Sequence, residues 1–518
     1  MDALIRFKKN VSRLALLEEH PFLPLLFILG LSILIKAVLI FQADIINDDG
    51  IRYVNAAHEL FQGNIAAAFV HEKMLGFVLL LGLTHAVVPD WFLAGKLLSS
   101  AALIVTTIPL YFLAQQLFGR RAALLTATAF TVAPIINDKC TAVIKDPLFL
   151  CLAVLSLCLM LLALEKSRWC FSLAAGFLCL FSVLVRPEGS VLFLVVAMFL
   201  GILAVFLPQS RSLNLKLVAA FCLPTFTASM IAIIMFISGA IAMDTLPGIH
   251  EKFAYYFQLD VMNNYKVIYQ HLKEVEENFP GGQWSNDFFE SARGNICLIY
   301  LFGLMQSYGK LLFPVFVIPL IWGLRLESKW NRQLVLFLTV LTSFLLMDYL
   351  YLLSRNYLSG RYLLLPVVLG FVLVGHGMDR ISISLSNLRF RKTAFTAVLI
   401  LCVLLPVGRA FVKVSHEKEE IKAAGVWLRD NRNMAHTKLI VSDERIAFYA
   451  GLYRGAYDTF QDNELNQLRE KTLHKDYDLV VAYRNKATMD ETPDLKGFSF
   501  IKDFAGNKKV ALIYEKKT

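Results

Sequence analysis

Repeated apolar segments constrain the fold of this chain more than any other feature of its sequence. About eleven of them are close to the roughly 20 residues that a helix needs to cross a bilayer. With 57% hydrophobic and only 18% charged residues, a single soluble core is excluded. We therefore predict a polytopic α-helical membrane protein whose first span, a retained signal anchor, covers about 21–41. The other predicted spans cover 96–118, 121–137, 147–164, 169–185, 189–207, 217–239, 311–325, 333–351, 362–377 and 393–411.

Two further apolar stretches, 75–90 and 296–308, raise the expected number of transmembrane helices to 11–13. We interpret 75–90 as a re-entrant or interfacial helix, because a full crossing there would place the later basic loops on the wrong side. Basic residues before the first span and in alternate later loops predict a cytoplasmic N-terminus and, with an odd number of crossings, an external C-terminus. These short clusters explain the net charge of +10, so nucleic acid is not an expected partner.

The composition divides the chain into two domains. Residues 1–412 form the predicted membrane domain, with outer loops at 43–74 and 240–295, and the second loop is long enough to close over a site. Residues 413–518 have the composition of a small soluble α/β domain. Its predicted elements are helices at 417–431 and 463–473, strands at 438–442 and 477–483, and a hairpin at 498–514.

An acidic pair, Asp48 and Asp49, follows the first span where the chain leaves the bilayer. Carboxylates at this depth are costly unless water, a metal or a substrate uses them, so the pair is the first candidate for chemistry. Glu72 and Asp146 are acids predicted on the same outer face. Structural alternatives exist, since Asp48 and Asp49 fit a turn with a helix N-cap and Asp146 fits the N-cap of the next span.

Four cations share this predicted outer face: Lys73, Arg186, Arg355 and Arg361. Arginines at an outer boundary oppose the usual charge bias, and anionic phosphate explains them because guanidinium forks match its oxygens. The alternatives are a solvated pair for Lys73 and a turn at Arg186. Carboxylates beside a phosphate-binding set indicate displacement at a carbon that bears a phosphate leaving group, with an acid as general base.

These residues also carry a family resemblance. The acidic pair with Tyr53 and a short amphipathic helix resembles glycosyltransferase family 39, the protein O-mannosyltransferase-like and lipid A aminoarabinose transferase-like membrane enzymes. The other motifs that carry the resemblance are 118–125 (FGRRAALL), 146–147 (DP), 186–189 (RPEG) and 360–364 (GRYLL). The resemblance implies a GT-C fold, a polyprenyl-phosphate sugar donor, inversion at the anomeric carbon and a bacterial inner membrane with a periplasmic C-terminal domain.

The resemblance also assigns site residues. The base falls on Asp48 or Asp49, the second-loop acid on Asp146, and the Glu-Lys pair after the surface helix on Glu72 and Lys73. The acidic pair is Asp-Asp rather than the more frequent Asp-Glu, and Met74-Leu75 replaces a frequent Pro pair. These differences leave the choice of base open, together with a divalent metal ion, whose predicted ligands are Asp48 and Glu72.

The predicted function is transfer of a sugar from a polyprenyl-phosphate donor to a lipid, protein or glycan acceptor. Arg355, Arg361 and Lys73 would hold the phosphate, and Tyr53, Glu72, Arg186 and Tyr362 complete the predicted substrate-binding set. A transporter or flippase is disfavoured because the charges crowd at the outer ends of the spans rather than near mid-membrane. A non-catalytic membrane scaffold is the other alternative, and it would leave Asp48 and Asp49 dispensable.

Overall fold

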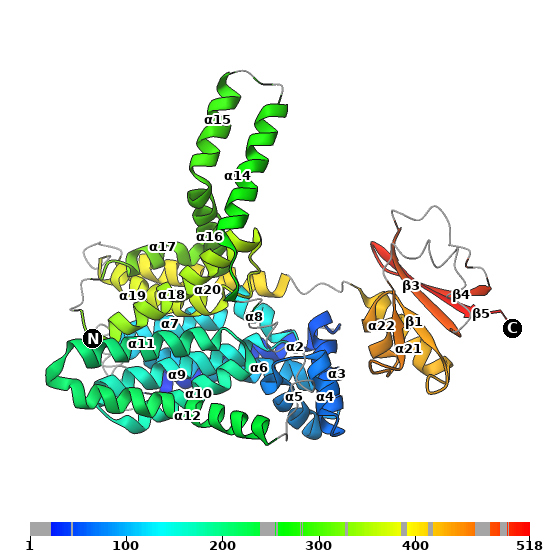
Figure 1. The fold of residues 1–518 in the computed structure, drawn as a ribbon, viewed down its shortest axis with the longest axis horizontal. Helices are drawn as coiled ribbons and strands as arrows, with labels where there is room; N and C mark the ends of the chain where they lie inside the picture. The colour runs from blue at the N-terminus through cyan, green and yellow to red at the C-terminus, as the bar shows by residue number, and fades with distance from the viewer. Residues whose placement is uncertain are drawn as a thin grey trace, which may run out of the picture.

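The structure is a computed structural model of the 518-residue chain. It describes residues 22–42, 45–238, 254, 257–279, 281, 283–326, 330–384, 391–412, 418–460, 477–486, 495 and 497–517. Figure 1 shows a bundle of long helices with a small sheet domain at one end of the helix axes, and we call this end of the bundle the domain face.

The bundle confirms a mostly helical membrane fold. Seven of the described helices are long and apolar enough to cross a bilayer, and up to nine crossings result if each of two bent helix pairs is one span. The seven are α2 (Leu23–Gln42), α6 (Trp91–Phe118), α9 (Asp146–Lys166), α11 (Gly189–Phe206), α12 (Arg211–Ile237), α18 (Arg332–Arg355) and α19 (Leu364–Ser384). Two predicted spans form shorter helices, α7 (Arg120–Val132) and α10 (Trp169–Val185), and the predicted span at 393–411 lies within the 22-residue helix α20 (Arg391–Val412).

The bent pairs coincide with the two ambiguous apolar stretches. Helices α4 (Ile65–His71) and α5 (Leu75–Val87) meet at 112°, and α16 (Ile296–Leu312) and α17 (Pro314–Gly323) meet at 110°. A bend of this size suits either a broken span or a re-entrant loop, so the interpretation of 75–90 as re-entrant or interfacial stays a prediction. The helix α8 (Pro134–Cys140) is a further short element, and α3 (Asp48–Phe61) is the amphipathic helix expected in the first loop.

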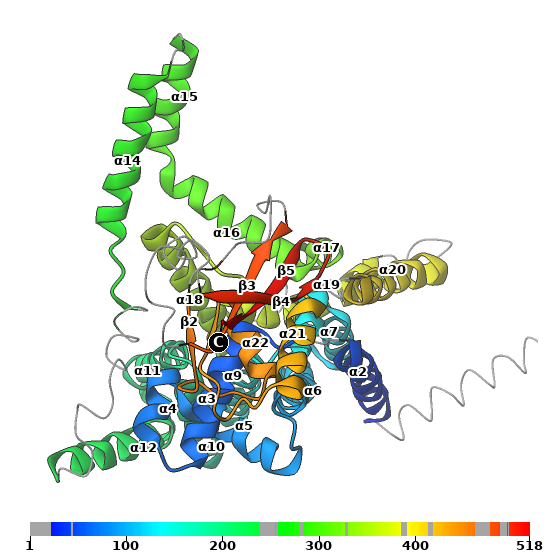
Figure 2. The same cartoon turned by 90° about the vertical axis from the view of Figure 1, so that its right-hand side faces the viewer.

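The second long loop contains a helical hairpin made of α14 (Val261–Asn278) and α15 (Gln283–Gly294). Figures 1 and 2 show that it projects sideways from the bundle, so in this conformation it does not cover the domain face. An ion pair between Arg293 and Glu276 joins the two helices. The side chains of Asn264 and Asn356 hydrogen bond to each other at 2.8 and 3.0 Å, which ties the base of the hairpin to the end of α18.

The C-terminal domain is a five-stranded sheet in the order β2-β1-β3-β5-β4. The strands are β1 (Leu439–Val441), β2 (Tyr457–Thr459), β3 (Leu479–Asn485), β4 (Phe498–Ala505) and β5 (Lys509–Lys516), with helices α21 (Glu419–Asn431) and α22 (Glu444–Tyr449). β1 pairs in parallel with β2 and β3, and β5 pairs antiparallel with β3 and β4. Most predicted elements are present, but α22 and β2 were not predicted, and the predicted helix at 463–473 lies outside the described residues.

The C-terminal domain contacts the first loop of the membrane domain. The backbone N–H of Ile46 donates to the Tyr449 hydroxyl at 2.8 Å, and the ring of Tyr453 stacks on His58 with centroids 3.7 Å apart. The Trp91 indole N–H donates to the Tyr453 hydroxyl at 3.1 Å. The unpredicted helix α22 and the turn after it therefore hold the sheet domain against α3 and the start of α6.

Candidate active site

Asp49 lies in the first turn of α3, where two arginines meet its carboxylate. Arg52, one turn later, forms an ion pair with it at 2.6 Å, and Arg361 reaches it from the segment between α18 and α19. Burial acts to raise the pKa of Asp49, but the charges of Arg361 and Arg52 outweigh burial and lower this pKa below its ordinary value. Asp49 is therefore ionised at neutral pH.

Asp146 joins Arg361 to a second arginine. It is the first residue of α9, is almost completely buried, and accepts from Arg361 Nη2 at 2.7 Å and Nε at 2.9 Å. Its other oxygen pairs with Arg186, which follows α10 and also pairs with Glu188. Asp49, Asp146, Glu188, Arg186 and Arg361 thus form one continuous network, which we call the carboxylate–arginine cluster.

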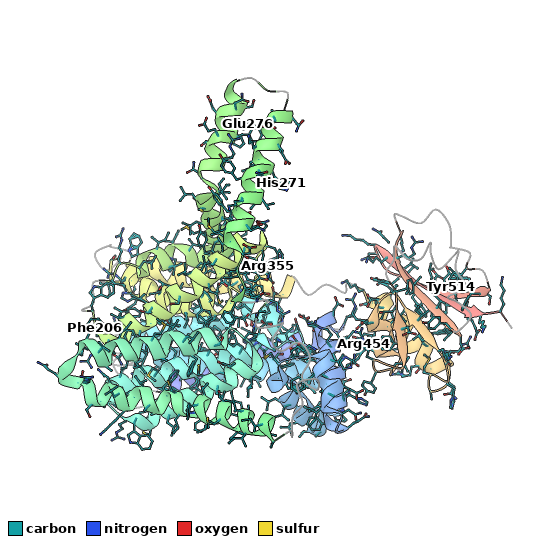
Figure 3. All side chains as sticks on the ribbon, viewed as in Figure 1. Phe206, His271, Glu276, Arg355, Arg454 and Tyr514 are labelled. Carbon is teal, nitrogen blue, oxygen red and sulfur yellow. The ribbon has the colours of Figure 1, made fainter. Side chains whose placement is uncertain are left out.

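Figure 3 shows on which end of the bundle this cluster lies. It labels Phe206, the last residue of α11, at the end remote from the C-terminal domain. Glu188 precedes the first residue of the same helix, so it lies at the domain face. Four chain segments that are far apart in the sequence meet at this level.

A second ion pair lies beside the cluster. Lys145 Nζ donates to Glu72 Oε1 at 3.1 Å, both side chains are buried, and the Met74 backbone N–H donates to the same oxygen at 3.0 Å. The Tyr53 ring centroid is 5.7 Å from Lys145 Nζ. Burial, with the negative charges of Asp49 and Glu72, raises the pKa of Tyr53 to about 12, so its hydroxyl stays protonated at neutral pH.

Aromatic rings flank the Arg186 guanidinium. It lies 5.7 Å from the ring centroids of both Phe149 and Tyr362, a distance at which a cation interacts with a ring face. The Tyr362 ring is 4.9 Å from that of Tyr351. Tyr362 therefore lies beside the cluster, next to Arg361 in the chain.

The convergence of these loops depends on contacts just before the acids. The Asn47 side chain accepts from the Val143 backbone N–H at 2.8 Å and donates to its carbonyl at 3.1 Å, like a paired strand residue. At Gly50 a Cβ atom would lie 2.9 Å from Ile46 Cγ1 and 3.0 Å from Val143 Cβ. Gly50 thus permits the close approach of α3 to the segment that carries Lys145 and Asp146.

Tyr53, Glu72 and Tyr362 lie beside the cluster, and three other predicted residues lie outside it. The side chain of Asp48 is 83% exposed and faces the C-terminal domain, where Arg445 Nε lies 3.3 Å from its carboxylate. Lys73 is half-buried and forms no ion pair within the described part of the chain. Arg355 is exposed at the end of α18, and its role stays a prediction (Figure 3).

The predicted metal ligands do not share a site. Asp48 pairs with Arg445, whereas Glu72 pairs with Lys145. Among all residues that the structure describes, no group of three or more His, Cys, Asp or Glu side chains is arranged to hold a metal ion. The described cations of this site are side chains of arginine and lysine.

Sequence reasoning missed Lys145, Glu188 and Arg445 as site residues. Glu188 lies within the 186–189 motif, and Lys145 directly precedes the 146–147 motif. Only the folded structure shows that Lys145 pairs with Glu72 and Glu188 with Arg186. Arg445 lies in the unpredicted helix α22, and no local signal connects it to a loop almost 400 positions earlier.

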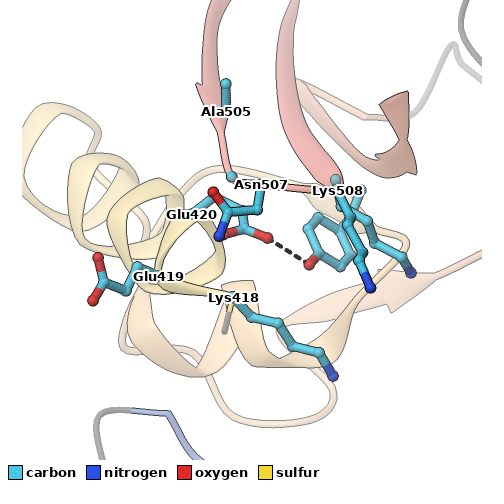
Figure 4. A pocket seen from close by; sticks show the side chains of 9 residues that line it. Lys418, Glu419, Glu420, Ala505, Asn507 and Lys508 are labelled. Atoms are coloured by element: carbon cyan, nitrogen blue, oxygen red, sulfur yellow. Dashed lines mark hydrogen bonds between the residues drawn. The ribbon is translucent and has the colours of Figure 1, made fainter. Parts of the chain in front are cut away.

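A pocket of about 470 Å³ in the C-terminal domain is a separate feature (Figure 4). Within it the Tyr483 hydroxyl donates to Glu420 at 2.7 Å. None of the predicted site residues lines it. Its lining residues carry both signs of charge: Lys418, Glu419, Glu420, Tyr483, Ala505, Gly506, Asn507, Lys508 and Lys509.

Comparisons with known proteins agree with this architecture. Residues 73–238 match the family model described as dolichyl-phosphate-mannose-protein mannosyltransferase. The structure resembles ArnT from Cupriavidus metallidurans bound to undecaprenyl phosphate, with a TM-score of 0.52 at 13% identity over 94% of this chain and 97% of that one. It also resembles the oligosaccharyltransferase AglB from Archaeoglobus fulgidus in complex with an inhibitory peptide and a dolichol-phosphate, with a TM-score of 0.54 at 12% identity over 90% and 70%.

No curated protein matches the chain. At these identities the structural likeness shows the fold alone. The family match and the fold together confirm the resemblance that the sequence motifs indicated.

Proposed function

We propose that this membrane protein, which has a GT-C fold, transfers a sugar from a polyprenyl-phosphate donor to an acceptor at its domain face. The similar structures of ArnT and AglB hold undecaprenyl phosphate and a dolichol-phosphate, respectively, which supports this donor class. The single observation that carries the proposal is that the Arg361 guanidinium lies between the carboxylates of Asp49 and Asp146 at the membrane boundary.

We assign the role of general base to Asp49 rather than Asp48. The Asp49 carboxylate is ionised and lies inside the cluster, whereas Asp48 faces the C-terminal domain. In the proposed step the acceptor hydroxyl or amine loses its proton to Asp49 while its oxygen or nitrogen bonds to the anomeric carbon. The bond from that carbon to the phosphate oxygen breaks on the opposite face, which inverts the centre and releases polyprenyl phosphate.

Arg361 would bind the departing phosphate. In the ligand-free structure its guanidinium is shared between Asp49 and Asp146. A donor phosphate competes for the same N–H groups, because bidentate arginine recognition suits phosphate as well as carboxylate. When Arg361 turns toward the phosphate, Asp49 loses a positive neighbour and becomes a stronger base. Donor binding would in this way activate the base.

The remaining predicted residues take supporting roles in this proposal. Asp146 and Glu188 hold the two arginines in place, and Tyr53 and Tyr362 border the space that the sugar would enter. Lys73 and Arg355 are further candidates for the phosphate, because both are cations at the domain face. The acceptor is a lipid, protein or glycan that reaches the same face.

A transfer assay tests the proposal. Purified protein in lipid nanodiscs receives isotope-labelled polyprenyl-phosphate sugars and membrane extract as acceptor, and mass spectrometry identifies glycosylated products. Loss of a general base typically lowers the rate by about 10²–10⁴-fold, so Asp49→Asn should fall in that range. Asp48→Asn is the matched control and should keep a rate within about tenfold of the wild type. Wild-type transfer by Asp49→Asn would contradict the assignment, and no transfer by the wild type with any donor would favour the transporter or scaffold alternatives.

We also propose that the domain face is periplasmic in a bacterial inner membrane, with a cytoplasmic N-terminus. The distribution of basic residues among alternate loops supports this orientation. Single-cysteine variants at Lys516 and Lys166, which lie in the sheet domain and at the far end of α9, test it with a membrane-impermeant thiol reagent. Only the variant at 516 should be labelled in intact cells.

A further inference from the structure

A cavity of about 780 Å³ lies where the C-terminal domain meets the membrane bundle. The last turn of α2, the start of α6 and residues of α21 and α22 line it. It shares no lining residue with the carboxylate–arginine cluster. The proposed transfer reaction therefore does not explain it.

A buried lysine lines this cavity. Lys96 lies in the second turn of α6, is only 6% exposed, and its Nζ donates to the carbonyl of Ile40 at 2.9 Å. The same Nζ is 4.1 Å from the Phe92 ring centroid. A buried ammonium within a membrane-spanning helix is costly, so it marks a place where a negative group gains binding energy.

The charge of the lining is positive. Lys422 and Arg429 of α21 join Lys96, whereas the only acid among the described lining residues is Asp90. The Asp90 carboxylate is engaged as the N-cap of α6, where it accepts from the Leu93 backbone N–H at 2.6 Å. An anion that enters the cavity thus meets more cations than carboxylates.

The position of the cavity fits an amphiphile. Aromatic side chains of the kind that belongs at a membrane interface line it, including Trp91. The exposed residues Phe27, Leu34, Val38 and Phe41 follow one face of α2, and Phe41 forms part of the cavity wall. An apolar chain that lies along this face would place its headgroup in the cavity.

We infer that this cavity binds a phosphate-bearing anionic lipid from the leaflet on the domain face, with its headgroup at Lys96 and its chain along α2. The bound lipid would also strengthen the junction between the domains. Tyr449 lines the cavity and accepts from Ile46, three residues before Asp49. Tyr453, another lining residue, contacts His58 and Trp91.

Native mass spectrometry of the full-length protein tests this inference with dioleoylphosphatidylglycerol and dioleoylphosphatidylcholine. The anionic lipid should bind about tenfold more tightly, which corresponds to about 1.4 kcal/mol. Lys96→Met should remove most of this preference. Lys502→Met is the control, because it changes a lysine of the sheet domain that does not line the cavity. This variant should keep the preference for the anionic lipid. If Lys96→Met does not fold, Lys422→Glu is tested in its place. This variant should lower the preference for the anionic lipid by about threefold or more.

A photoreactive phosphatidylglycerol then locates the site. Crosslinks should fall on peptides that contain 89–96 and 448–453, and millimolar inorganic phosphate should not displace the lipid. Equal affinity for the two lipids, displacement by inorganic phosphate, or crosslinks confined to peptides of the carboxylate–arginine cluster would each overturn the inference. None of these readouts depends on sugar transfer, so they are independent of the proposed reaction.

Discussion

Arg361 Nη2 lies 2.7 Å from Asp146 Oδ2, although 215 positions separate the two residues in the sequence. The Asp146 side chain is nearly inaccessible, whereas that of Arg361 is about one-third exposed. The pair therefore has one anchored partner and one partner that can reach a ligand. This asymmetry is the basis of the first two predictions.

Arg361→Lys should lower the rate of sugar transfer by about 10–100-fold. The single ammonium group of lysine cannot replace the N–H groups with which the Arg361 guanidinium contacts two carboxylates and would bind the phosphate. Each factor of ten corresponds to about 1.4 kcal/mol of transition-state stabilisation. Initial rates with a saturating donor measure the effect. Arg432→Lys, which alters a peripheral pair with Glu515 in the C-terminal domain, is the matched control and should keep its rate. Equal rates for the two variants would remove Arg361 from the proposed mechanism.

Asp146→Asn should destabilise the membrane domain by about 3–5 kcal/mol, the usual effect of removing one partner from a buried ion pair. The change leaves Arg186 and Arg361 without their shared carboxylate. A thermal unfolding curve in detergent measures it. Asp430→Asn removes an exposed carboxylate that pairs with Arg429 and should change stability by no more than about 0.5 kcal/mol. A melting temperature equal to that of the wild type would show that the network adds no stability.

Much of this site could be predicted from the sequence. Asp49, Asp146, Arg186 and Arg361 were chosen because charged residues at the ends of apolar spans need a reason, and all four meet in one network. That reasoning is local, since it weighs each residue against its own span. It therefore predicts where the helices end, but not which side chains of different helices contact one another.

The choice between Asp48 and Asp49 illustrates what local reasoning could not supply. Adjacent residues on a helix point about 100° apart, so only the placement of neighbouring elements decides which of the two joins the carboxylate–arginine cluster. Here Arg445, in a helix too short to be predicted, lies against Asp48. The fold class followed from hydropathy alone. The number of spans also depends on α7 and α10, which have 13 and 17 residues and are shorter than most membrane-spanning helices.

The decrease of the melting temperature at acidic pH should depend on Asp49. Its pKa in the folded protein lies below the ordinary 3.8 of an unfolded chain, so its ion pairs contribute fully above that value. The contribution is lost as the pH falls through the lower, folded pKa. Melting temperatures of the wild type should thus drop between about pH 4 and the acid limit, and Asp49→Asn should flatten this part of the curve. Parallel curves for the two proteins would contradict the lowered pKa.

Tyr449→Phe should loosen the junction between the domains without unfolding either one. The hydroxyl accepts the only hydrogen bond recorded for the Ile46 N–H among the described residues, and such a bond contributes about 1 kcal/mol. Limited proteolysis should release the C-terminal domain about fivefold faster, as that free energy implies if cleavage follows opening. Tyr477→Phe is the control, because the Tyr477 hydroxyl donates a hydrogen bond to Asp458 within the sheet domain. Proteolysis of this variant should release the C-terminal domain at the wild-type rate.

Gly50→Ala should impair both stability and sugar transfer. The added methyl group would lie 2.9 Å from Ile46 Cγ1 and 3.0 Å from Val143 Cβ, so one of these neighbours must move. Overpacking of this kind costs about 1–3 kcal/mol, and the movement would shift Asp49 away from Arg361. A displacement of about 1 Å at a reacting group lowers rates about 100-fold. Gly30→Ala is the matched control, because nothing lies within 4 Å of its Cβ position in α2. Wild-type transfer by Gly50→Ala would show that Asp49 tolerates this shift, and would weaken its assignment as the base.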